Sequence, residues 1–223
     1  MTLDILWLSA LKALSDLIPG PSYAWTVLAI AGRLAYVGYI WVMLSRQVKD
    51  PWSSKDRRQR AYRNFRRGAV IVMNLDAILF IVATVRNANE IPAYHSLLLS
   101  VGIVLLLIGI VVKIAAFKAL GSHGYYWGDF FLPEKNSGPV RKGIYRHLKN
   151  PMYDAGYLHA YGFACICFSW TGLALAGLMQ LTIKLFGRFL ETPNFHRVYG
   201  NLQQRVDSET GWQPSLNDKR TAQ

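Results

Sequence analysis

Long apolar runs separated by short basic segments constrain this chain of 223 residues more than any other feature. Three runs, over residues 23–44, 68–85 and 94–120, are long enough to cross a bilayer. A transmembrane helix needs about 20 predominantly apolar residues. The pattern therefore predicts an all-α, multi-pass helical membrane protein that forms a single domain over residues 1–223.

The first and last parts of the chain differ from these three spans. Residues 1–21 contain a short apolar segment with helical periodicity, interrupted by Lys12 and Asp16, which predicts a short or re-entrant helix. Residues 155–186 are too long for one span, and Ser169-Trp170-Thr171-Gly172 supplies a turn near their middle. We expect three full spans, this C-terminal helical hairpin, an interfacial helix over 191–205 and a polar tail over 206–223.

The basic residues indicate which ends of the spans share a side. Residues 45–67 form a basic loop within the first section of the chain, residues 22–93. Such loops remain cytoplasmic and attract anionic lipid headgroups by roughly 1 kcal/mol per basic residue. The basic segment 121–153 is expected on the same side, and residues 86–92 on the opposite one. Because the charge lies beside membrane spans, we expect no nucleic-acid partner.

Charged residues and cysteines are rare inside the apolar runs, and each has few possible roles. Carboxylates within a membrane are rare, so Asp76 is either a functional residue or the ion-pair partner of Arg33. Cys165 and Cys167 lie too close together in an apolar run to form a structural disulfide. We predict buried thiols and no metal site.

The segment 121–153 is the longest stretch without periodicity, and such a loop is usually functional or disordered. Its many aromatic residues favour an ordered loop over a binding site. Gly121, Gly124 and Gly128 allow close approach of the backbone to a ligand, and Asp129 supplies a hydrogen-bond acceptor.

A second motif, G-P-V-R-K-G-I-Y-R-H-L-K-N-P-M-Y, ends at Tyr153. Its Asn150-Pro151 step predicts the start of the hairpin, because the residue before proline disfavours the helical conformation. The basic residues here either mark the headgroup level or surround a charged cofactor at a helix N-terminus. The residues alone leave both alternatives open.

Both motifs resemble the integral-membrane methyltransferases, which include phospholipid N-methyltransferases and isoprenylcysteine carboxyl methyltransferases. The segments Ala119–Phe131 and Asn150–Tyr153 look most like the phosphatidylethanolamine N-methyltransferase branch. The isoprenylcysteine branch usually has Arg-His-Pro-x-Tyr at the second position. The resemblance extends over roughly residues 105–199 and implies that residues 94–205 form the cofactor-binding and catalytic half.

The resemblance implies S-adenosyl-L-methionine as the cofactor. It assigns Glu191 to the amino group of the cofactor and Gly109 to close approach of its body, whereas Leu107 and Thr192 depart from the family pattern. The other candidate cofactor-binding residues are Gly121, Gly124, Tyr125, Gly128, Arg146, Lys149, Asn150, Pro151 and Tyr153. The candidate catalytic residues are His147, Asp129 and Glu191, with His123 as a further polar candidate.

Two of these assignments have alternatives. Arg146 and Lys149 bind either the cofactor carboxylate or a lipid phosphate, or they only mark the cytoplasmic face. The aromatic residues of the first motif either contact a sulfonium or methylated ammonium ion through cation–π interactions or lie at the membrane interface. They are Tyr125, Tyr126 and Trp127, together with Tyr153.

The function that the resemblance implies is methylation of a phospholipid headgroup amine at the cytoplasmic membrane face. The expected substrates are phosphatidylethanolamine and its mono- and dimethyl forms, in the direction of phosphatidylcholine. Two alternatives stay open: the same fold acting on a thiol or prenylcysteine carboxylate, and a non-enzymatic membrane protein that has lost the activity. A homodimer is also left open, and we expect a bacterial inner membrane rather than the endoplasmic reticulum.

Overall fold

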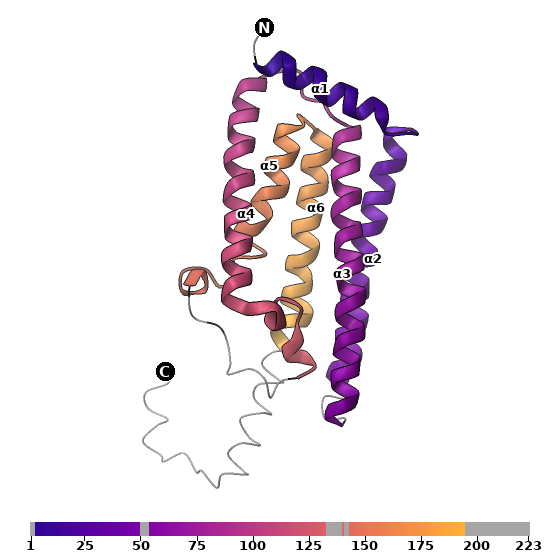
Figure 1. Ribbon diagram of the computed structural model, residues 1–223, viewed down its shortest axis with the longest axis vertical. Coiled ribbons are helices and arrows are strands. Elements are labelled where there is room, and N and C mark those ends of the chain that lie inside the picture. The colour runs from indigo at the N-terminus through magenta and orange to yellow at the C-terminus, as the bar shows by residue number, and fades with distance from the viewer. Residues whose placement is uncertain (1–2, 50–53, 133–139, 141–142, 195–223) are drawn as a thin grey trace.

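The computed structural model describes residues 3–49, 54–132, 140 and 143–194, and every regular element in these ranges is a helix (Figure 1). The helices are α1 (Leu3–Leu17), α2 (Ser22–Lys49), α3 (Lys55–Arg86), α4 (His95–Tyr125), α5 (Leu158–Ile166) and α6 (Trp170–Phe186). Shorter helical turns are η1 (Gly128–Phe130), η3 (Gly143–Arg146), η4 (Ala155–Tyr157) and the π-helix η5 (Gly187–Glu191). The expected all-α class is confirmed.

Four helical stretches are long and apolar enough to cross a membrane: Ser22–Lys49, Lys55–Arg86, His95–Phe130 and Trp170–Asn194. The first three contain the three spans predicted from the sequence. In the predicted hairpin only α6 is long, because α5 has nine residues. At 1.5 Å per residue α5 is too short to cross a bilayer alone.

The segment before α5 is built from turns that depend on side chains for part of their hydrogen bonding. The Gln180 side chain donates from Nε2 to the carbonyl oxygens of Tyr153 (3.1 Å) and Asp154 (3.0 Å). Irregular backbone at membrane depth requires partners of this kind, since lipid offers none. One side chain of α6 therefore fixes the start of the shorter hairpin arm.

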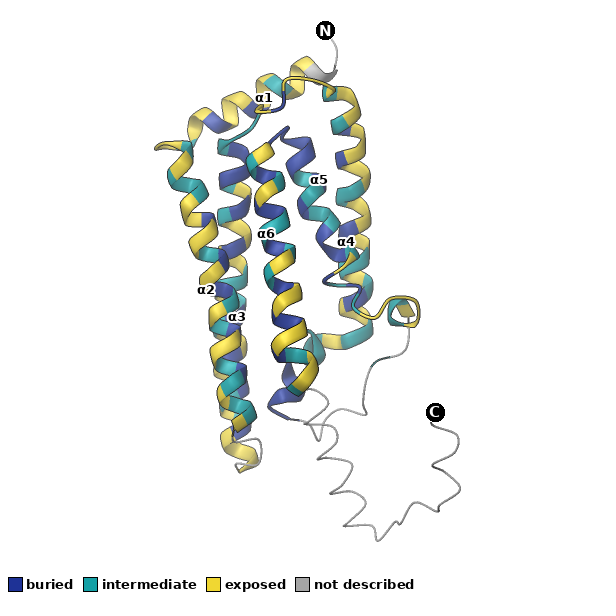
Figure 2. Ribbon diagram, turned by 180° about the vertical axis from the view of Figure 1, so that it is seen from behind, coloured by how far each residue is buried: buried dark blue, intermediate teal, exposed yellow. Residues whose placement is uncertain are grey.

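Helices α2 to α6 run along the long axis of the molecule, and α1 lies across one end of the bundle (Figure 1). The Trp7 indole donates to the carbonyl of Ile166 at 2.8 Å, which attaches α1 to the end of α5. Many outward-facing side chains of α2 and α4 are exposed, while α5 and α6 are more buried (Figure 2). The predicted short N-terminal helix is thus present, and it covers the bundle end.

The basic segment 45–67 differs from its prediction as a loop. Helix α2 extends to Lys49 and α3 begins at Lys55, so most of the basic residues lie on helices. Lys and Arg are good helix formers, and a helix that continues beyond the bilayer keeps their charges solvated. The predicted interfacial helix and tail, residues 191–223, lie mostly outside the described residues.

Glycine residues allow α4 and α5 to pack with their backbones in close contact. A Cβ atom on Gly109 would lie 2.1 Å from the backbone nitrogen of His159, and one on Gly162 would lie 2.3 Å from that of Leu106. Helices in a membrane associate through such small residues, because apolar surface alone gives no preference for helix over lipid.

The turn between α5 and α6 lies two to three residues earlier than the predicted Ser169–Gly172. Phe168 takes a positive φ of 52°, and α6 begins at Trp170. The Ser169 hydroxyl accepts from the backbone N–H of Gly172 at 2.9 Å, which caps the helix. Cys165 and Cys167 are free and buried, as predicted.

We expect Gly162→Ala to lower the stability of the bundle, whereas Gly38→Ala changes it little. The new methyl group at residue 162 meets the α4 backbone, and overpacking of this kind costs about 1–3 kcal/mol. A Cβ atom at Gly38 meets nothing within 4 Å. Thermal unfolding in detergent, followed by tryptophan fluorescence, measures the difference. Equal melting temperatures for the two variants would contradict close α4–α5 packing.

Candidate functional site

Two backbone features turn the chain inward after α4. Gly121 adopts φ 68° and ψ 172°, which kinks the helix, and Trp127 adopts a left-handed φ of 50°. The Trp127 ring is buried at the end of the bundle, where it contacts Phe186 edge-on with centroids 5.6 Å apart and Phe65 at 6.4 Å. The first loop motif therefore closes this end of the bundle.

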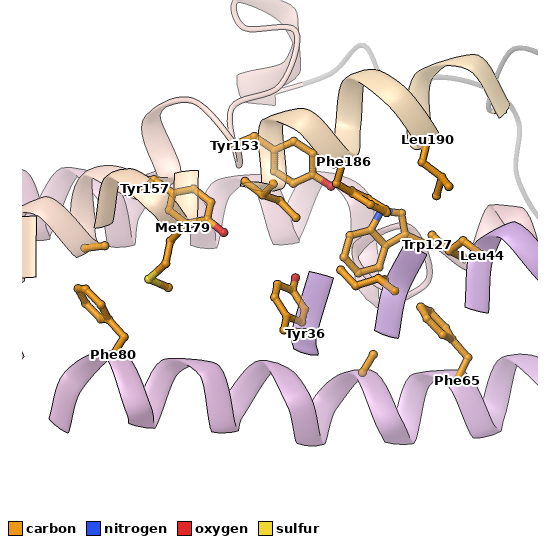
Figure 3. Close-up of a cluster of buried hydrophobic side chains, with 14 of the residues drawn as sticks. Tyr36, Leu44, Phe65, Phe80, Trp127, Tyr153, Tyr157, Met179, Phe186 and Leu190 are labelled. Atoms are coloured by element: carbon orange, nitrogen blue, oxygen red, sulfur yellow. The ribbon is translucent and has the colours of Figure 1, made fainter. Parts of the chain in front are cut away.

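Glu191 meets two aromatic residues from distant parts of the chain. Helix α6 continues into η5, a π-helix of the kind often found at functional sites. The Tyr153 hydroxyl donates to Glu191 Oε2 at 2.8 Å, and the Trp127 side chain forms a second hydrogen bond with this carboxylate. Figure 3 shows Tyr153, Trp127 and Phe186 side by side. We call Glu191, Tyr153 and Trp127 the carboxylate–aromatic group.

The environment of Glu191 keeps the neighbouring phenols protonated. Burial, and secondarily the Glu191 carboxylate, raises the pKa of Tyr153 well above its ordinary value. The same two causes raise the pKa of Tyr145 in η3. Both hydroxyl groups therefore keep their protons at neutral pH and remain hydrogen-bond donors beside the carboxylate.

Asp129 and His123 form a second polar group near the same end. Asp129 is buried, its Oδ1 lies 3.3 Å from His123 Nε2, and the His123 ring lies 5.3 Å from the ring of Tyr62. Within the described ranges, the Tyr62 hydroxyl is buried without a hydrogen-bond partner, and His123 Nε2 and Asp129 Oδ1 have no polar contact beyond the one with each other. Buried polar atoms normally have partners, so this group offers donors and acceptors to a polar ligand.

The predicted cofactor-binding glycines have different surroundings. Gly109 packs against α5, Gly121 forms the kink, and a Cβ atom on Gly124 would contact only Leu120. Gly128 lies under the His123 ring, where a Cβ atom would come within 2.3 Å. Close packing thus explains Gly109 and Gly128 without any ligand.

The second motif divides into a buried part and an exposed part. Pro151 is buried, and the Asn150 carbonyl accepts from the backbone N–H groups of Tyr153 (3.1 Å) and Asp154 (3.0 Å), a turn that directs Tyr153 inward. The remaining predicted residues of this motif are exposed: Arg146, His147 and Lys149.

Tyr125 and the two residues that depart from the family pattern, Leu107 and Thr192, all lie outside the carboxylate–aromatic group. Tyr125 contacts Phe117 and Tyr126 edge-on, with centroids 5.1 and 4.9 Å apart. Leu107 is 57% exposed on the outer surface of α4, and the Thr192 hydroxyl donates to the carbonyl of Gly187 at 2.9 Å. Neither departure disturbs the carboxylate–aromatic group.

Arg33 and Asp76 form a buried ion pair, with 2.9 Å between Arg33 Nη1 and Asp76 Oδ2. Arg33 also donates from Nε to the Thr182 hydroxyl at 2.8 Å and from Nη2 to the Tyr157 hydroxyl at 3.1 Å and the carbonyl of Met179. The pairing predicted as one alternative for Asp76 is therefore present. The contacts with α6 and η4 were not predicted.

A cavity of about 270 Å³ adjoins this ion pair. Its polar lining includes Arg33, Asp76, Lys113 and His159, and α3 supplies apolar residues around them. Lys113 lies toward the C-terminal end of the apolar run 94–120, and no motif contains it. The only sequence signal for this cavity is that charges within spans normally face protein or a polar cavity.

The fold and these polar groups define a multi-span helical membrane protein with an internal site at one end of its bundle. Residues 97–202 of the chain match the family model described as phospholipid methyltransferase. This match confirms the resemblance predicted from the two loop motifs. No solved structure matches the chain.

Curated proteins similar to the chain are phosphatidylethanolamine N-methyltransferases. The chain is 32% identical over 151 residues to the enzyme of Lodderomyces elongisporus. This alignment covers 64% of this chain and 17% of the relative. Identity is 34% over 113 residues with Eremothecium gossypii (49% and 13% covered) and 28% over 158 residues with a Saccharomyces cerevisiae strain (69% and 17% covered).

The chain thus spans 13–17% of the length of these three relatives. All three come from fungi, and they give no support to a bacterial inner membrane over the endoplasmic reticulum.

We expect Arg33→Met to destabilise the protein by about 3–5 kcal/mol, because it leaves the Asp76 carboxylate buried without its counter-ion. The double variant Arg33→Met/Asp76→Leu should recover part of that loss, since it removes both charges. Free energies of unfolding in mixed micelles, measured for both single variants and the double variant, test the coupling. Additive losses would show that the pair has no interaction energy.

Proposed function

We propose that the chain transfers methyl groups from S-adenosyl-L-methionine to the headgroup amine of phosphatidylethanolamine and its mono- and dimethyl forms. The observation that carries the proposal is the convergence of Glu191, Tyr153 and Trp127, from three separate segments, inside the region that matches the phospholipid methyltransferase family. The names of the curated relatives support the substrate class.

The residues present fit this cofactor. The Glu191 carboxylate suits a cationic amino group, because a charge-assisted hydrogen bond is stronger than a neutral one. The faces of Trp127 and Tyr153 suit a sulfonium ion through cation–π attraction. Tyr62 and the His123–Asp129 pair contribute buried polar atoms with hydrogen-bonding capacity left among the residues described, which suit the polar remainder of such a molecule.

S-adenosyl-L-methionine, when bound, supplies a methyl carbon that is already activated for transfer. The protein must therefore hold the amine in line with that carbon and exclude water. The buried aromatic residues around Trp127 support both tasks. The headgroup amine must lose a proton before its nitrogen can accept the methyl group, so the site also needs a proton acceptor.

We favour Asp129, with His123 beside it, as the acceptor of that proton. Asp129 is buried and lies 3.3 Å from His123, whereas the predicted candidate His147 is exposed and Glu191 is hydrogen-bonded to Tyr153 and assigned to the cofactor amino group. A proton acceptor must come within hydrogen-bond reach of the amine, and only a group inside the site meets that requirement. Arg146 and Lys149 remain proposed contacts for an anionic group of the cofactor or lipid at the cytoplasmic face.

We expect Glu191→Gln to weaken binding of S-adenosyl-L-methionine at least about tenfold, since hydrogen bonds to charged groups contribute about 1.5–3 kcal/mol. Transfer of labelled methyl to phosphatidylethanolamine in nanodiscs should fall in parallel. The control is Asp16→Asn, which removes an exposed carboxylate from α1 at the other end of the bundle.

Phosphatidylethanolamine and its mono- and dimethyl forms are supplied in separate nanodiscs to identify the steps performed. Cofactor binding without label in any of the three lipids would overturn the proposed substrate and favour a thiol or prenylcysteine carboxylate. Absence of cofactor binding by the unaltered protein would overturn the proposed activity.

A further inference from the structure

The cavity beside Arg33 has exposed apolar residues of α3 in its lining. Its rim includes Ala77 and Ile81 of α3, both exposed on the apolar surface, and Leu106 of α4. Phe80 and Phe163 continue the apolar lining inward. In Figure 1, α5 and α6 lie between α4 and α3, and they add His159, Phe163 and Met179 to the lining. The exposed apolar residues of α3 in the lining favour access from the bilayer.

The two cations that line the cavity differ in their partners. Arg33 uses four of its five N–H donors on Asp76, Thr182, Tyr157 and the Met179 carbonyl, and the Asp76 carboxylate balances its charge. Lys113, in contrast, has its ammonium group 3.2 Å from His159 Nε2 and 5.4 Å from the centroid of the Tyr157 ring.

The tautomer of His159 determines how many N–H donors of Lys113 remain free to bind a ligand. The Nδ1 atom of His159 lies 2.5 Å from the carbonyl oxygen of Gly156, which accepts hydrogen bonds only, so Nδ1 carries the proton. Nε2 of the neutral ring then accepts from the Lys113 ammonium. Two of the three Lys113 N–H donors remain for a molecule in the cavity.

The charges around the cavity leave an excess of one positive charge. Arg33 and Asp76 neutralise each other, His159 is neutral, and no carboxylate among the residues described lies within ion-pair distance of Lys113. An ammonium group with only neutral partners in apolar surroundings is costly, and such groups within membranes usually serve a ligand. The cavity therefore suits an anion that arrives with an apolar portion.

We propose that Lys113 binds the phosphate of a phospholipid whose headgroup enters the cavity between α3 and α4 from the bilayer. Lysine is a common ligand of phosphate, and the apolar rim fits the glycerol and upper acyl chains. A cavity of about 270 Å³ admits a headgroup and leaves the acyl chains among the lipids.

The position of Tyr36 connects this cavity to the carboxylate–aromatic group. Tyr36 lines the cavity, and Figure 3 shows it between Phe80 and Tyr157 on one side and Trp127 on the other, with Tyr153 across from it. A headgroup held by its phosphate at Lys113 thus directs its amine along Tyr36 toward Glu191. The inference rests on the proposed function for the role of this lipid as methyl acceptor.

The test measures lipid binding separately from methyl transfer. We compare Lys113→Met with Lys113→Arg and with Lys118→Met, which removes an exposed lysine from the same helix. Binding of spin-labelled phosphatidylethanolamine is titrated in detergent micelles, and binding of S-adenosyl-L-methionine serves as the check on folding. We expect Lys113→Met to weaken lipid binding about tenfold, while Lys113→Arg and Lys118→Met stay within about threefold.

In the transfer assay the same loss should appear in KM for the lipid, with kcat within about threefold of its original value. Diacylglycerol, which lacks the phosphate, should compete poorly, and water-soluble glycerophosphoethanolamine, which lacks the acyl chains, should not displace the lipid. Unchanged lipid binding by Lys113→Met, or equal competition by either molecule, would overturn the inference. If no variant transfers methyl groups, the binding titration alone still decides it.

Discussion

The Arg33 guanidinium connects four separate elements of the bundle through hydrogen bonds. It contacts Asp76 on α3, Thr182 on α6 and Tyr157 in η4, and it extends from α2. In a bilayer no water replaces a lost partner, so these contacts have to be made together. The position of η4, and with it the turn that carries Tyr153, depends on this one buried cation.

Local composition was enough to predict the class of the fold, because span length and charge distribution are properties of single segments. It did not distinguish a basic loop from helices that extend beyond the bilayer, since Lys and Arg suit both. It also did not reveal that α5 has only nine residues. The composition of residues 150–166 suits a long helix as well as turns followed by a short helix. The side chain that stabilises the turns, Gln180, comes from α6 and so is not visible in that segment.

The candidate site was predicted as a set of residues but not as an arrangement. Tyr153 and Glu191 came from the family pattern, yet their meeting with Trp127 depends on a π-helix and a left-handed residue that no spacing rule indicates. The contact between Lys113 and His159 joins residues 46 positions apart, so no local motif contains it. Sequence patterns report neighbours along a helix far better than neighbours between helices.

The hydrogen bonds of Gln180 also fix the two arms of the hairpin in register. Sliding the start of α5 along α6 by one residue would leave the carbonyls of Tyr153 and Asp154 without partners in apolar surroundings. The spacing between Tyr153, on the turn before α5, and Glu191, beyond the end of α6, is therefore set by the backbone. A ligand that contacts both Tyr153 and Glu191 must match this spacing, and changes in the outer loops leave the spacing unaltered.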